Sequence, residues 1–216
     1  MANFLITLPE HDDLTDYCSK WSAEIIKTAE EMRHDTKKLK GSEANRKNFE
    51  GRIATHNPSF VMFNGHGNSS AVAGHSNVII LTCDGSAPNE GLSRNRIIYV
   101  RACGCGSELG PACITAGCRS FVGYKKDFAL IKSKSKVSRP LEDERARPFF
   151  EVSNQIPIAI LKGSTVDEAV GKADVKLEKE VQRLMTSDSF LASHLIPWLL
   201  WNQKVRVVLG NRAATI

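Results

Sequence analysis

One histidine and one cysteine follow two predicted strands, and side chains of these types could carry out nucleophilic catalysis. The strand predicted over residues 59–64 leads into His66 and Gly67, and the strand over residues 97–100 leads towards Cys103. A cysteine thiol and a nearby imidazole can act together as nucleophile and proton carrier. Ligands of parallel sheets bind beyond the carboxyl ends of the strands. The placement therefore predicts a Cys–His site at one edge of a sheet.

Each of the two residues also has an ordinary structural interpretation. A histidine in a loop is often only structural, and a cysteine that ends a buried strand is often a small core residue. A thiol at a strand-to-helix turn is stabilised as thiolate by the helix N-terminus, which favours a reactive Cys103. Cys105 lies two residues further on and is an ambiguous neighbour, but the Ala-Cys context favours Cys103 as the nucleophile.

The other cysteines leave a zinc site open as an alternative. Cys103, Cys105, Cys113 and Cys118 fall within sixteen residues. Their spacing lacks the paired C-x2-C knuckles of structural zinc sites, and Cys113 and Cys118 are most simply core residues. We therefore expect neither a metal nor a cofactor. His75 also follows a glycine, but the loop over residues 71–77 reads as exposed.

The elements that must position the site alternate between strands and helices. Such alternation is typical of an α/β sandwich with a mostly parallel sheet, here six-stranded and within a single domain over residues 1–216. Strands are predicted over residues 4–8, 59–64, 78–81, 97–100, 120–124 and 205–210, with a short edge strand over 37–41. Helices are predicted over residues 13–32, 43–55, 109–116 and 167–185.

Charge and composition narrow the class of protein. The 216 residues are 42% hydrophobic and 25% charged, with a net charge of +5. Residues 125–147 hold eight basic and four acidic residues, so most of the excess positive charge lies in one segment. A nucleic-acid-binding protein would instead carry a basic face spread over its fold. Residues 132–148 read as a long exposed loop. The start resembles no signal peptide and no apolar run is long enough to span a membrane, so we expect a cytoplasmic protein with reduced cysteines.

Several blocks resemble the caspase-like cysteine peptidases, including the CHAT, gingipain-type and legumain-like enzymes. Residues 39–49 (LKGSEANRKNF) and 57–67 (NPSFVMFNGHG) are similar to the helix and strand that precede the catalytic His-Gly. Residues 97–107 (IIYVRACGCGS) are similar to the strand that ends in the nucleophile. Residues 116–124 and 207–211 extend the resemblance over most of the chain.

The resemblance implies a caspase-like fold and cysteine endopeptidase activity. Cys103 would attack the scissile carbonyl, His66 would protonate the departing amine, and the N–H groups of Gly67 and Cys103 would form the oxyanion hole. No carboxylate is required as a third member. Arg101, two residues before the nucleophile, would line the pocket for the residue before the cleaved bond (P1) and favour an acidic side chain. Asp84 could instead favour a basic one.

These features together predict an enzyme that cleaves a specific protein partner, in a bacterial defence (antiviral) or cell-death cascade. Residues 132–148 would then be an activation or docking element for an activating protein partner. Neither nucleic acid nor membrane is expected as a partner. The alternative is a non-catalytic caspase-fold adaptor. A flavodoxin-like nucleotide binder is disfavoured because no strand ends in a G-x-G-x-x-G or P-loop.

Overall fold

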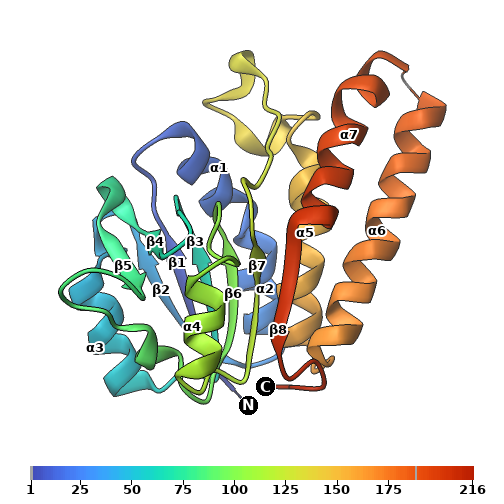
Figure 1. Ribbon diagram of the computed structural model, residues 1–216. Helices are drawn as coiled ribbons and strands as arrows, with labels where there is room; N and C mark the ends of the chain where they lie inside the picture. The colour runs from blue at the N-terminus through green and yellow to red at the C-terminus, as the bar shows by residue number, and fades with distance from the viewer. Residues whose placement is uncertain (1, 188) are drawn as a thin grey trace.

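The central feature of the computed structural model, which describes residues 2–187 and 189–216, is a six-stranded sheet (Figure 1). The strand order is β2-β1-β3-β6-β7-β8, and all neighbours pair in parallel except β7 and β8. The prediction of a mostly parallel six-stranded sheet is confirmed. The strands are β1 (Asn3–Leu8), β2 (Asp35–Lys40), β3 (Phe60–Asn64), β6 (Ile97–Arg101), β7 (Ser120–Tyr124) and β8 (Arg206–Gly210).

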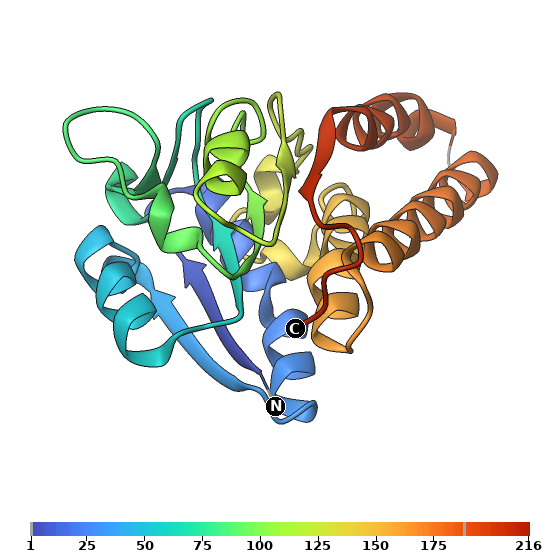
Figure 2. The same cartoon turned by 60° about the horizontal axis from the view of Figure 1, so that its bottom comes forward.

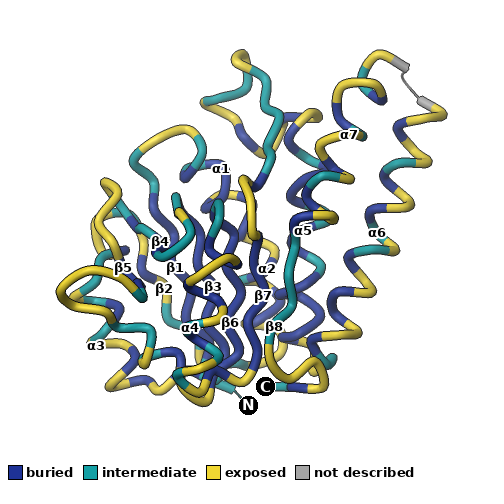
Figure 3. Tube along the Cα trace, viewed as in Figure 1, coloured by how far each residue is buried: buried dark blue, intermediate teal, exposed yellow. Residues whose placement is uncertain are grey.

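Helices cover both faces of this sheet, which is why its inner strands are apolar on both sides. Met62 of β3 packs with helices α2 (Ala23–Glu31), α5 (Arg147–Leu161) and α6 (Val166–Ser187). Its neighbours Val61 and Phe63 pack on the opposite face with α3 (Arg46–His56) and α4 (Leu109–Thr115). Figures 1 and 2 show the two helical layers on either side of the sheet, and Figure 3 shows the buried strands between them.

The remaining elements lie around this sandwich. Helix α1 (Asp13–Trp21) follows β1, and α7 (Ser189–Val205) packs on α6 and leads into β8. The predicted strand over residues 78–81 belongs to a separate small antiparallel sheet of β4 (Ala71–Ala73) and β5 (Ile79–Thr82). Short 3₁₀ turns are η1 (Gly41–Glu43), η2 (His75–Asn77), η3 (Glu90–Ser93), η4 (Lys134–Lys136) and η5 (Pro140–Glu142). No helix among the described residues is both long enough and apolar enough to cross a membrane.

The segment over residues 132–148 is less free than the sequence suggested. Asp143 is 1% exposed and accepts hydrogen bonds from the Tyr17 hydroxyl at 2.8 Å and the Ser133 N–H at 2.7 Å. The Trp21 indole donates to the Pro140 carbonyl at 3.1 Å. The segment is therefore not exposed along its whole length: its second half is anchored on α1, and its exposed positions are 134, 135, 138, 139, 141, 142, 144 and 145.

Candidate active site

The two predicted site residues lie just beyond the carboxyl ends of two neighbouring strands, at equivalent positions. Asn64 of β3 is in register with Arg101 of β6, and His66 and Cys103 each lie two residues further along. Gly67 sits directly against the second segment, because a Cβ there would lie 2.8 Å from the Cys103 carbonyl oxygen. Only glycine allows backbones to approach this closely. The structure thus brings the His66–Gly67 and Cys103 segments together.

His66 has a carboxylate partner that sequence reasoning did not find. Its Nε2 lies 2.6 Å from Asp12 Oδ2, and Asp12 caps the N-terminus of α1 by accepting the Thr15 N–H at 2.9 Å. Burial opposes ionisation of Asp12, but the hydrogen bonds from Thr15 and His66 prevail and lower its pKa to about 2. An ionised carboxylate fixes the orientation and tautomer of an imidazole. The available signal was an N-cap aspartate after β1, which ends at the same edge of the sheet.

Cys103 is half-buried and faces the segment that follows β7. Its side chain packs with Tyr124 and Phe128. Burial raises the pKa of the Cys103 thiol, and the Asp127 carboxylate adds to this, against the opposing effect of the Phe128 N–H. The expected thiolate at a helix N-terminus is therefore not found, since α4 begins only at Leu109. Within residues 2–187 and 189–216, no hydrogen bond joins the Cys103 thiol to His66.

Cys105, the ambiguous neighbour, is placed where no substrate could reach it. It is 0% exposed, and its Sγ donates to the Ala71 carbonyl at 3.3 Å and the Cys103 carbonyl at 3.4 Å. Burial raises the pKa of its thiol to about 12. Cys113 and Cys118 are buried in the core between the sheet and α4. In the described part of the chain the four thiols do not converge on a common metal position.

Two backbone donors near Cys103 are available for an oxyanion. His66 and Asn68 bond across to the β4 segment, with Ala73 N–H to His66 O at 2.9 Å and Asn68 N–H to Ala71 O at 3.0 Å. This pairing leaves the intervening Gly67 N–H without a protein acceptor in the structure as described, and the same holds for the Cys103 N–H. Such groups can bind a developing negative charge.

Arg101 is not a substrate-binding residue in this structure, which corrects the expectation from its place before the nucleophile. It is 1% exposed and stacks over the Phe150 ring at 5.0 Å from the ring centroid. Its guanidinium is fully engaged inside the protein, because the donors reach Asn64 Oδ1, Ser153 Oγ, Asn154 Oδ1, the Cys18 carbonyl and Ser22 Oγ at 2.7–3.1 Å.

Asp84 is exposed, as a specificity residue would need to be. It lines a surface hollow of about 300 Å³ together with Asn68 and Ser70, which follow the His66–Gly67 segment. Arg46 lines the same hollow, but its Nε is paired with Glu50 at 2.7 Å. The hollow therefore keeps one carboxylate that a basic side chain could reach.

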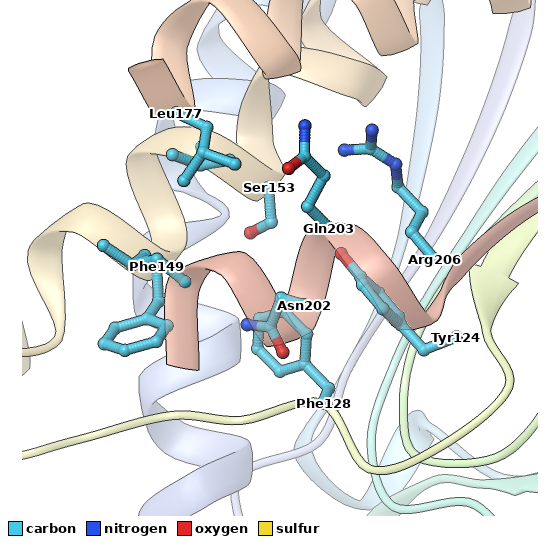
Figure 4. A pocket seen from close by; sticks show the side chains of 10 residues that line it. Tyr124, Phe128, Phe149, Ser153, Leu177, Asn202, Gln203 and Arg206 are labelled. Carbon is cyan, nitrogen blue, oxygen red and sulfur yellow. The ribbon is translucent and has the colours of Figure 1, made fainter. Parts of the chain in front are cut away.

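A second cavity lies behind the Phe128 segment, where α5, α6 and α7 meet the end of β7 (Figure 4). Its volume of about 10 Å³ has room for at most a single water molecule, so it is not a substrate pocket. Figure 4 shows its lining side chains, which include Tyr124, Phe128, Phe149, Ser153, Leu177, Asn202, Gln203 and Arg206.

Comparison with known proteins identifies the fold. No family model and no curated protein sequence matches the chain. Among solved structures, the chain is similar to the Arg-specific cysteine proteinase gingipain R, with a TM-score of 0.60 at 10% identity, covering 99% of this chain and 47% of that one. It is equally similar to the complex of RgpB pro- and mature domains of Porphyromonas gingivalis, with a TM-score of 0.61 at 9% identity, covering 99% of this chain and 48% of that chain. The chain spans about half the length of these structures, and over that length it has their caspase-like α/β fold.

Proposed function

We propose that this chain is a cysteine endopeptidase with Cys103 as nucleophile and His66 as proton carrier. The observation that carries the proposal is the register of β3 and β6, which brings the chain positions of His66 and Cys103 to one edge of the sheet. The hydrogen bond of 2.6 Å between His66 Nε2 and Asp12 Oδ2 gives the imidazole a fixed partner. Cys103 is also the more accessible of the two thiols in the Cys103–Cys105 segment.

The reaction follows from the atoms that remain free. His66 Nε2 carries a proton towards Asp12, so its Nδ1 takes the proton of the Cys103 thiol while Sγ forms a bond to the scissile carbonyl carbon. The carbonyl oxygen becomes an oxyanion held by the N–H groups of Gly67 and Cys103. His66 then gives its proton to the departing amine, the C–N bond breaks, and a thioester remains. Water activated by His66 hydrolyses the thioester and restores the thiol.

The raised pKa of the Cys103 thiol makes the base necessary for attack. A thiol that rests protonated needs a base within reach at the moment of attack, and catalytic hydrogen bonds are often formed only in the substrate complex. We therefore place engagement of Cys103 by His66 at substrate binding, when the thiol leaves its contacts beside Asp127 and Phe128.

Active-site labelling tests the proposal. A peptide acyloxymethylketone should label the wild type and Cys105→Ala but not Cys103→Ala or His66→Ala, as read by intact mass. Cys83→Ala is the matched control because Cys83 is the other cysteine with partial exposure, and its loss should leave labelling unchanged. Equal labelling of the wild type and Cys103→Ala would refute Cys103 as nucleophile.

The same measurement separates the enzyme from a non-catalytic adaptor with the caspase-like fold. Two observations favour the adaptor: the Cys103 thiol does not contact His66 by a hydrogen bond in the described residues, and burial keeps that thiol protonated. An adaptor would show no labelling of Cys103 above that of Cys83 in the folded protein.

For specificity we propose a basic P1 residue, recognised by Asp84. Arg101 is excluded by its burial, and gingipain R, which shares the fold, is Arg specific. In a panel of fluorogenic peptides, Asp84→Asn should lower kcat/KM for Arg and Lys at P1 and leave neutral P1 residues unchanged. A preference for Asp or Glu at P1 would overturn this assignment.

For regulation we propose that the exposed part of residues 132–148 docks an activating protein partner. Lys134, Arg139 and Arg145 are exposed there together with Glu142 and Glu144, while Asp143 anchors the segment, so a partner surface that is mainly acidic fits. Six free cysteines support a reducing, cytoplasmic setting, and a partner-gated peptidase there would suit a bacterial defence or cell-death cascade. Retained regulation in a Lys134→Ala, Arg139→Ala, Arg145→Ala triple variant would count against the docking role.

A further inference from the structure

Two imidazoles and one carboxylate meet at the His66 end of the proposed catalytic centre, on the side away from Cys103's neighbours Tyr124 and Phe128. His11 and Asp12 lie in the segment between β1 and α1, and His66 follows β3. One ligand atom from each of the three residues lies within 4.8 Å of the other two. His66 Nε2 is 2.6 Å and His11 Nε2 is 3.6 Å from Asp12 Oδ2.

These spacings are close to those of a tetrahedral metal site. Bonds of about 2.0–2.2 Å from Zn²⁺ to nitrogen or oxygen separate two ligand atoms by about 3.3–3.5 Å. The Asp12–His66 contact must open by less than about 1 Å, and the Asp12–His11 distance of 3.6 Å needs almost no change. The two histidine rings already face each other edge to face, with centroids 5.8 Å apart.

Hydrogen bonds from neighbouring groups orient the three side chains so that their ligand atoms point towards a common position. Thr15 donates from its N–H at 2.9 Å and from its hydroxyl at 2.9 Å to Asp12 Oδ1, which leaves Oδ2 turned to the histidines. Thr15 Oγ1 also lies 3.5 Å from His11 Nδ1, and a proton on Nδ1 places the lone pair on His11 Nε2. Partners that orient ligands in this way are typical of metal sites. Two imidazoles with one carboxylate suit Zn²⁺ and similar transition metals.

We propose that His11, Asp12 and His66 form a binding site for a divalent transition metal of the Zn²⁺ class, and that occupation of this site switches off the proposed peptidase. The second half of this inference rests on the proposed function. With the metal on Nε2 and a proton on Nδ1, the His66 ring has no lone pair to take the Cys103 proton. No covalent bond to substrate is needed for this block, and removal of the metal restores the ring.

A hydrogen bond between Asp12 and His66 does not by itself require a second histidine, His11, beside the pair. A second histidine–aspartate pair, His56 with Asp35 at 3.3 Å, is not joined by a third ligand atom from any described residue. His11 Nε2 does lie 3.3 Å from Asn77 Oδ1, an exposed contact that a metal can replace. His75 is close to His11, with ring centroids 5.3 Å apart, but is outside the ligand group, which makes it the matched control.

Cobalt binding tests the site without requiring any enzymatic activity. Co²⁺ added to the full chain should give the visible absorption of a four-coordinate ion, and the same spectrum should appear in Cys103→Ala and His75→Ala. His11→Ala should weaken Co²⁺ binding at least about tenfold, because loss of even an outer-shell partner costs that much in metal sites. His11→Asn provides a second variant, and circular dichroism checks that both variants are folded.

Two results would overturn the site. One is unchanged Co²⁺ affinity in His11→Ala and His11→Asn. The other is loss of the spectrum in Cys103→Ala together with a thiolate-to-cobalt band in the wild type, which would place the metal on Cys103. For inhibition, Zn²⁺ should reversibly stop labelling of Cys103, and His11→Ala should raise the half-inhibitory Zn²⁺ concentration at least about tenfold. Unaffected labelling at saturating Zn²⁺ would refute the switch, whereas a chain that never labels but still binds Co²⁺ would refute the peptidase and leave the metal site standing.

Discussion

Replacement of Arg101 by methionine should destabilise the fold strongly and should not create a new P1 preference. The guanidinium is buried at 1% exposure and supplies hydrogen bonds to acceptors from β3, α1 and α5. Methionine approximates the length of the side chain but donates nothing. The Asn64 and Asn154 side-chain oxygens, both on residues that are 0% exposed, would then lack a donor.

The expected loss in the free energy of unfolding follows from the two buried oxygens that would lack a donor. Each buried acceptor without a partner costs about 1–3 kcal/mol, so two amide oxygens cost about 2–6 kcal/mol. The hydroxyls of Ser22 and Ser153 can rotate to new partners, and removal of a buried charge returns part of its desolvation penalty. We expect a loss of about 3–5 kcal/mol in the free energy of unfolding. At about 2–4 °C per kcal/mol for a chain of this size, Tm should fall by roughly 10 °C.

Urea unfolding followed by circular dichroism measures the effect, with Cm expected to fall at an unchanged m-value. Arg101→Lys keeps the charge but loses the planar fork, so it should be affected less than Arg101→Met while staying folded. Arg145→Met is the control, because Arg145 is exposed and such changes usually stay within about 0.5 kcal/mol. A stability loss below about 1 kcal/mol together with an altered P1 preference would refute the structural role.

Three other changes probe the site and its support. Asp12→Asn should lower kcat/KM and remove an acid-dependent part of stability: since the folded pKa of Asp12 is depressed from 3.8 to about 2, that part is present above about pH 4 and is lost as the pH falls towards 2. Asp12 is 38% exposed, so we expect only about 1 kcal/mol, measured as the difference in urea stability between pH 5 and pH 2.5 in wild type and variant. Gly67→Ala should abolish Cys103 labelling, because its Cβ would overlap Cys105 Sγ and the Cys103 carbonyl; undiminished labelling would contradict the close approach. Asp143→Asn should release the 132–148 segment at a cost of about 1–3 kcal/mol, seen as faster limited proteolysis near residues 134–145, and an unchanged cleavage pattern would contradict the anchor.

The ends of β3 and β6 could be predicted because an uninterrupted apolar run in the sequence marks a buried strand and shows where it stops. Residues 60–63 are apolar without interruption and are buried on both sides, so the sequence alone indicates an inner strand and the position of His66 at its end. The same holds for residues 97–100 and Cys103. Parallel pairing then brings the two ends to one edge without knowledge of any side-chain contact.

The roles of Asp12 and Arg101 could not be predicted from the sequence, because their hydrogen-bond partners come from segments that are distant along the chain. Asp12 reads as an ordinary N-cap, and its second bond, to His66, joins residues separated by 54 positions. Arg101 was expected at a pocket because, in the peptidases that the sequence resembles, the residue two before the nucleophile lines the P1 pocket. Its acceptors are neutral groups on three different elements, and no charge pattern in the sequence signals such a cage.

The buried hydrogen-bond network around Arg101 also fixes the relative positions of the strands that carry the site residues. Thr7 and Asn64 bond reciprocally: the Asn64 N–H donates to Thr7 Oγ1 at 3.0 Å, and the Thr7 hydroxyl donates to the Asn64 carbonyl at 3.1 Å. The Asn64 side-chain amide also donates to the Thr7 carbonyl at 2.9 Å. Arg101 then donates to Asn64 Oδ1, so the ends of β1, β3 and β6 are tied together just before Asp12, His66 and Cys103 emerge. A fully satisfied polar network of this kind fixes one register where apolar contacts alone would tolerate small slips. The precision of the three site residues therefore depends on a layer that no substrate touches, and Arg101→Lys should reduce Cys103 labelling even under conditions where the variant remains folded.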